Sequence, residues 1–111
     1  MAVTCNPTVR IGGVTHPLVR IFYALCLLDE DPVDGQPEDL VITSLNDSTH
    51  KKQSRHYTNE ACDVRSKSFR DEKAKAAFVS QLEATLGSGF TVLYEMPGGD
   101  SQHFHIQPRK V

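Results

Sequence analysis

Near the C-terminus, polar and apolar residues alternate strictly over residues 103–107, HFHIQ. Successive side chains of a β-strand point to opposite faces of a sheet, so this run predicts a half-buried strand. His103 and His105 share one face of that strand, and Phe104 and Ile106 share the other. The fold must therefore contain a sheet that packs one apolar face against a core and carries two histidines on its second face.

Other segments have the β-branched and apolar composition of strands. They are residues 40–45, 60–65 and 90–95, with residues 8–11 as a candidate edge strand. Residues 90–95 and 103–107 form a hairpin with a loop of about seven residues, which is longer than the usual two to five. Alternation also turns Asp63 away from Cys62 and Val64, and turns Glu95 toward the face of Thr91 and Leu93.

Two segments have the spacing of amphipathic helices. The first begins at Thr15-His16-Pro17, where Pro suits the first helical position, and ends near residues 29–31. Its apolar stripe contains Leu18, Ile21, Phe22, Leu25 and Leu28. The second spans residues 69–86, with Ser68 as the predicted cap and Gly87 and Gly89 after its end. Its stripe contains Ala74, Phe78, Leu82 and Leu86.

These elements predict one α+β domain over residues 1–111. We expect a small antiparallel sheet, with the two main helices on one face and a groove that contains the histidines on the other. Three separated cysteines exclude a disulfide framework, and Cys26 and Cys62 are expected to be small buried residues.

The formal net charge of −2 provides no electrostatic basis for binding nucleic acid. The longest apolar run, residues 21–28, is too short to span a bilayer, so no membrane insertion is expected. The N-terminal residues lack the basic and then apolar pattern of a secretory signal. We therefore expect the chain to be cytoplasmic as synthesised.

Residues 54–63 contain the pattern S-x-H-Y-x-x-x-A-x-D, which includes His56 and Asp63. A second motif follows later in the chain, where Tyr94-Glu95 precedes His103-Phe104-His105. Imidazole and carboxylate groups from two separated segments are the ligands of an open zinc site, which uses three protein ligands and leaves a fourth position for water.

The two motifs, in this order, resemble the zinc-binding segments of D-alanyl-D-alanine carboxypeptidases, phage endolysin peptidases and the hedgehog signalling domain. The resemblance covers roughly residues 40–107. That family usually has Gly where this chain has Asn59, and Asn is the non-glycine residue that best tolerates a positive φ.

The resemblance implies a role for each matching residue. His56, Asp63 and His105 would be the ligands of Zn²⁺, and Glu95 would be the general base. A second branch of the family instead implies His103 as the third ligand and Asp100 as the base. The remaining candidates are His50 and His103 as groups that stabilise an oxyanion, and Ser54 as a substrate contact. Apart from the resemblance, the positive charge of Arg55 and Arg65 makes both candidate contacts for an anionic substrate.

The implied function is a zinc metallopeptidase of the D,D- or L,D-carboxypeptidase or endopeptidase type. Its substrate would be a peptidoglycan stem peptide or a similar small peptide, cleaved at a D-amino-acid bond by metal-activated water. A bacterial or phage protein would fit, and release at lysis or association with a virion would bring it to the cell wall. The alternative is a non-catalytic zinc-binding module, either hedgehog-like or a structural part of a virion.

Overall fold

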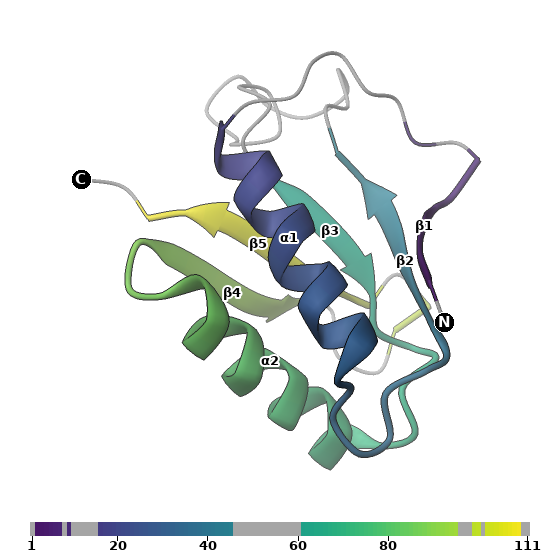
Figure 1. Cartoon of the computed structure of the whole chain (residues 1–111). Coiled ribbons are helices and arrows are strands. Elements are labelled where there is room, and N and C mark those ends of the chain that lie inside the picture. The colour runs from purple at the N-terminus through teal and green to yellow at the C-terminus, as the bar shows by residue number, and fades with distance from the viewer. Residues whose placement is uncertain are drawn as a thin grey trace.

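One five-stranded sheet is covered on one face by two helices (Figure 1). The computed structural model describes residues 2–7, 9, 16–45, 61–95, 99–100 and 102–109. The elements in chain order are β1 (Ala2–Cys5), α1 (His16–Glu30), β2 (Asp39–Ser44), β3 (Cys62–Arg65), α2 (Glu72–Leu86), β4 (Phe90–Glu95) and β5 (His103–Pro108). The α+β architecture with both main helices on one face is therefore confirmed.

The strands lie in the order β1-β2-β3-β5-β4. All neighbouring pairs are antiparallel except β1 and β2, which are parallel. The prediction of a wholly antiparallel sheet was wrong at this edge. Parallel strands need a long crossover connection, and α1 lies between β1 and β2 in the chain. The first strand is Ala2–Cys5, whereas Val9, the one described residue of the predicted edge strand at 8–11, lies outside any strand.

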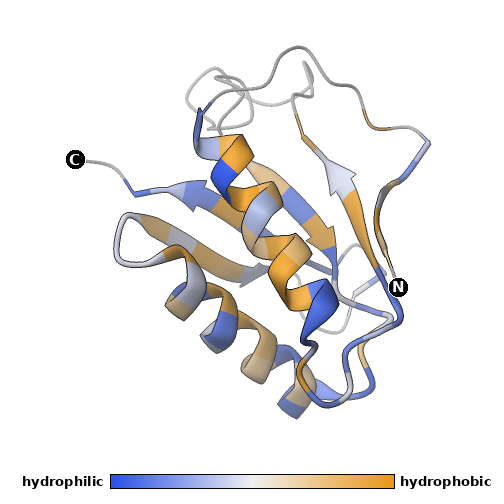
Figure 2. Cartoon of the chain, viewed as in Figure 1, coloured by the Kyte–Doolittle hydropathy of each residue, from blue (hydrophilic) through white to orange (hydrophobic). Residues whose placement is uncertain are grey.

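The core forms where the helices meet the sheet, and the predicted alternation accounts for its sheet side. Cys62 and Val64 of β3 and Phe104 and Ile106 of β5 are fully buried. Figure 2 shows the matching alternation of hydrophilic and hydrophobic residues along these strands. The rings of Phe69, Phe78 and Phe104 meet at centroid distances of 4.9 to 5.2 Å, which joins α2 to the sheet.

Both helices bury the predicted stripes. In α1, Leu18, Ile21, Leu25 and Leu28 are buried and Phe22 packs partly against the core. In α2, Ala74, Phe78, Leu82 and Leu86 are buried. Cys26 is exposed, so the prediction that it is buried was wrong. It follows Leu25 by one residue, and a step of about 100° turns it to the outer side of the helix.

The N-cap of α2 lies three residues later than predicted. Its N-cap is Asp71, whose Oδ1 accepts a hydrogen bond of 2.8 Å from the amide of Ala74. Ser68 lies in the preceding turn, because the side chain of Phe69 is buried in the core before the helix begins. The helix ends at Leu86 and is capped by Gly87, whose φ of 85° is readily adopted only by glycine. No helix in the described ranges is long and apolar enough to cross a membrane.

Candidate functional site

Strands β3, β5 and β4 bring together polar side chains from distant parts of the chain. Asp63 of β3 is the Cα partner of His105 in β5, and Glu95 of β4 is the partner of His103. The neighbours of these residues along each strand face the core. Because side chains alternate, Asp63, Glu95, His103 and His105 lie on the sheet face opposite the helices. We call these four residues the strand cluster.

The closest contact in the strand cluster joins His105 and Asp63, with Nδ1 2.8 Å from Oδ1. On its other side, Nε2 of His105 lies 2.7 Å from Oε1 of Gln107. Both ring nitrogens thus face acceptors, and only the imidazolium form donates from both. Burial disfavours the charged form, but the hydrogen bonds to Asp63 and Gln107 outweigh it, so the pKa of His105 is raised above its ordinary value.

The second contact joins His103 and Glu95, with Nε2 2.9 Å from Oε1. The same nitrogen lies 3.8 Å from Oδ2 of Asp63, and Oε1 of Glu95 lies 4.0 Å from Nδ1 of His105. The side chain of Asp63 is 9% exposed and that of Glu95 is 44% exposed. The cluster therefore has a buried carboxylate at its base and an accessible carboxylate at its edge, bridged by two imidazoles.

No family model, curated protein or solved structure matches the chain in comparisons with known proteins.

The structure brings together those predicted site residues that it describes on the three strands. His50, Ser54, Arg55 and His56 lie outside the described residues. The metal role of His56 and the roles of the other three therefore stay predictions. The alternative base, Asp100, is exposed and lies beside His103 in a groove, whereas Glu95 directly contacts His103.

The donor groups of the cluster suit zinc in kind. Carboxylate oxygen and imidazole nitrogen are both common zinc ligands. Among the residues that the structure describes, no three histidine, cysteine, aspartate or glutamate side chains form a group that could hold a metal ion. Of the predicted ligands, the described part of the chain contains Asp63 and His105, which is one fewer than an open zinc site needs.

The spacing of Asp63 and His105 indicates what metal binding would require. Two ligand atoms of one tetrahedral zinc, each about 2.0 Å from the metal, lie about 3.3 Å from each other. Oδ1 of Asp63 and Nδ1 of His105 are 2.8 Å apart and share a proton. Zinc would replace that proton, because a metal-bound imidazole is neutral, and the two side chains would separate slightly.

A polar groove adjoins the strand cluster at His103. It is also lined by Thr43, Arg65, Lys67, Asp100 and Gln102. Arg65 is the Cα partner of His103 and shares the face of Asp63, because it lies two residues further along β3. The groove therefore places two cationic side chains beside the imidazole of His103.

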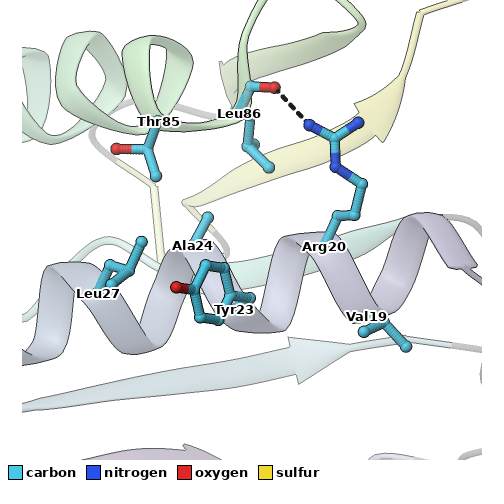
Figure 3. A pocket seen from close by; sticks show the side chains of 7 residues that line it. All are labelled: Val19, Arg20, Tyr23, Ala24, Leu27, Thr85 and Leu86. Atoms are coloured by element: carbon cyan, nitrogen blue, oxygen red, sulfur yellow. Dashed lines mark hydrogen bonds between the residues drawn. The ribbon is translucent and has the colours of Figure 1, made fainter.

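A second hollow lies between α1 and α2, away from the strand cluster (Figure 3). It is lined by Val19, Arg20, Tyr23, Ala24, Leu27, Thr85 and Leu86. Its one charged side chain, Arg20, donates a hydrogen bond of 3.1 Å to the carbonyl of Leu86 and lies over the ring of Phe90. This hollow thus lacks the paired acid and base groups of the sheet face.

Sequence reasoning missed Lys75 and Gln102, which support the cluster from the inner side of the sheet. Lys75 is a buried lysine of α2, and its Nζ lies 2.7 Å from Oε1 of Gln102. A signal for Lys75 was present in the sequence, because it precedes Phe78 by three residues and Leu82 by seven. At helical spacing those positions share one face, so the lysine lies on the buried stripe.

Proposed function

We propose that the protein is a zinc-dependent peptidase that cleaves small peptides of the bacterial cell wall. The observation that supports this proposal is the convergence of Asp63, Glu95, His103 and His105 from three strands onto one sheet face. The convergence requires a particular register between segments that are far apart in the chain. All four residues belong to the two sequence motifs.

In the proposed site, Asp63 and His105 hold zinc together with His56. Zinc, when bound, polarises a carbonyl oxygen and lowers the pKa of water toward neutrality. The orientation of His105 is restrained by Gln107, whose Oε1 lies 2.7 Å from Nε2. Restraint of the second ring nitrogen is a common feature of histidine ligands, because it fixes the ring for the metal.

Glu95 is the proposed general base. Its carboxylate is the most exposed of the cluster and lies 4.0 Å from Nδ1 of His105, so it is accessible to a substrate near the metal ligand. A carboxylate in that position can accept a proton from water as the water attacks a peptide carbonyl. His103, 2.9 Å from Glu95, is the proposed donor of a hydrogen bond to the developing oxyanion, with His50 as a second donor.

The polar groove is the proposed substrate contact on the described side of the site. Arg65 and Lys67 supply positive charge next to His103, which suits a peptide with carboxylate groups. Peptidoglycan stem peptides have this character, and cleavage at a D-amino-acid bond is implied by the motif resemblance. Ser54 and Arg55 are the proposed contacts from the other segment.

The decisive experiment measures zinc content and hydrolysis of purified stem peptides by the same preparation. We expect about one zinc per chain, release of a D-amino acid or a shortened peptide detected by mass spectrometry, and loss of both on chelation. Zinc without hydrolysis of any stem peptide would favour the non-catalytic module instead. A protein that contains no zinc and hydrolyses no stem peptide would refute the proposal.

A matched pair of variants tests the assignment of the base. Glu95→Gln should keep its zinc and lower kcat by about 100-fold or more, which is the usual contribution of a positioned general base. Asp100→Asn serves as the control, because it also replaces a carboxylate with a neutral amide, at the position of the alternative base. The reverse result, with Asp100→Asn inactive and Glu95→Gln active, would transfer the role to Asp100.

A further inference from the structure

Lys75 of α2 is buried beneath the sheet, and its side chain is only 10% exposed. Burial of an ammonium group is costly unless each of its donors finds an acceptor. Lysine has three N–H donors, and three acceptors surround this one. They are Oε1 of Gln102 at 2.7 Å, Oε2 of Glu72 at 2.8 Å and the hydroxyl of Tyr94 at 3.2 Å.

The acceptors of Lys75 are themselves linked to one another and to the neighbouring strand. Oε1 of Gln102 also accepts a hydrogen bond of 3.0 Å from the hydroxyl of Ser66. The amide nitrogen of the same side chain donates to the carbonyl of Gly99 at 3.0 Å. The hydroxyl of Tyr94 lies 3.3 Å from both carboxylate oxygens of Glu72 and can donate to that group. The ammonium thus joins α2, β4 and the residue that precedes β5.

Tyr94 and Gln102, the two acceptors that lie outside α2, are each the chain neighbour of a residue in the strand cluster. Tyr94 precedes Glu95, and Gln102 precedes His103. Ser66, whose hydroxyl donates to the same oxygen of Gln102, follows Arg65, the Cα partner of His103. Because side chains alternate, the contacts of Lys75 lie on the inner side of the same strand ends that carry Glu95 and His103 on the outer side.

We propose that Lys75 is a positioning residue that sets the separation of Glu95 and His103 across β4 and β5. The 2.9 Å contact of those two side chains depends on how closely the two strand ends approach. The Lys75 ammonium binds both ends at once, through Tyr94 and Gln102. The catalytic consequence rests on the proposed function, whereas the effect on strand pairing does not.

The test compares Lys75→Met with Lys73→Met. Methionine keeps the length and apolar stem of lysine and removes the charge and the donors. Lys73 is exposed on the same helix two residues away, so it controls for the loss of one lysine from α2. The first measurement is amide hydrogen exchange along β4 and β5, which needs no catalytic activity.

We expect Lys75→Met to raise exchange about tenfold or more at residues 94–95 and 102–103, with little change near Phe90, because local opening depends on local contacts. Lys73→Met should leave the whole pattern unchanged. Equal acceleration along the entire sheet would mean that Lys75 only stabilises the fold, and would overturn the proposal. Unchanged exchange at the strand ends would overturn it as well.

The second measurement is steady-state kinetics. In Lys75→Met, kcat should fall by about tenfold or more while KM and zinc content stay near those of the parent, because a small displacement of a reacting group is costly. In a Glu95→Gln background, Lys75→Met should lower kcat little further, because Lys75 influences catalysis through the position of Glu95. Additive losses would contradict the positioning role.

The role of Lys75 can still be tested if the parent protein is inactive or if Lys75→Met does not fold. If the parent protein hydrolyses no peptide, the proposed function fails and the exchange experiment still decides the role of Lys75. If Lys75→Met does not fold, Gln102→Met replaces it, because this variant removes the shared acceptor and leaves the lysine in place. Unaltered exchange at residues 94–95 and 103 in that variant would refute the proposal.

Discussion

Glu95 and His103 face each other across β4 and β5, with Oε1 of the glutamate 2.9 Å from Nε2 of the histidine. His103 also lies 3.8 Å from Asp63, so it joins the accessible carboxylate to the buried one. The separation of the two carboxylates is therefore set by imidazole groups between them. In the proposed function, the buried carboxylate of Asp63 binds the metal and the accessible carboxylate of Glu95 accepts the proton.

The two histidines of β5 should differ in their effect on zinc. We predict that His105→Ala loses most bound zinc, because it removes a proposed ligand and a three-ligand site tolerates no such loss. His103→Ala should keep its zinc and lose mainly turnover, measured as metal content and kcat on the same samples. Zinc retained in His105→Ala and lost in His103→Ala would assign the third ligand to His103.

Arg65 should control the affinity for anionic peptides. We predict that Arg65→Gln raises KM for a stem peptide by about tenfold while kcat changes little, which is the pattern for a contact made equally in ground and transition states. The control is Lys73→Gln, which removes a positive charge from the exposed side of α2, away from the groove. A fall in kcat at constant KM would instead place Arg65 among the groups that act on the transition state.

The cap of α2 offers a direct contrast between neighbouring residues. Asp71→Ala should lower the thermal midpoint, because the amide of Ala74 loses its acceptor, whereas Ser68→Ala should leave the midpoint almost unchanged. The hydrogen bond from Ala74, and then the contact with Arg70, hold the pKa of Asp71 below its ordinary value. The difference in thermal midpoint between Asp71→Ala and the parent should therefore be largest above the ordinary aspartate pKa. It should shrink as the pH falls through the lowered pKa of Asp71 in the folded protein.

The aromatic contact between α2 and the sheet should dominate stability. Phe78 is fully buried and touches the rings of Phe69 and Phe104. Phe78→Ala should lower the free energy of unfolding by about 3–5 kcal/mol, through lost burial and the cavity left behind. Gln81→Ala, at an exposed position of the same helix, should change it by less than about 0.5 kcal/mol. Urea unfolding followed by circular dichroism measures both, and equal effects would contradict the burial of Phe78 between the other two rings.

Most secondary structure could be predicted because it depends on local periodicity. The four-residue repeat from Ala74 to Leu86 is enough to locate α2, and alternation from His103 to Ile106 is enough to locate β5 and its core face. Errors arose where a tertiary contact competes with a local signal. Ser68 is a good cap by residue type, but burial of Phe69 places it in a turn and leaves Asp71 as the cap.

The candidate site was likewise predictable in part. The two sequence motifs and their resemblance to a zinc peptidase family nominated Asp63, Glu95, His103 and His105, and the alternation of each strand predicted their faces. Only the tertiary structure decided that Asp63 pairs with His105, 42 residues away, and that Glu95 pairs with His103. Register between distant strands depends on the packing of the whole core, so no local pattern determines it. For the same reason, the position of Lys75 on a buried stripe became informative only when Tyr94 and Gln102 were found around its ammonium.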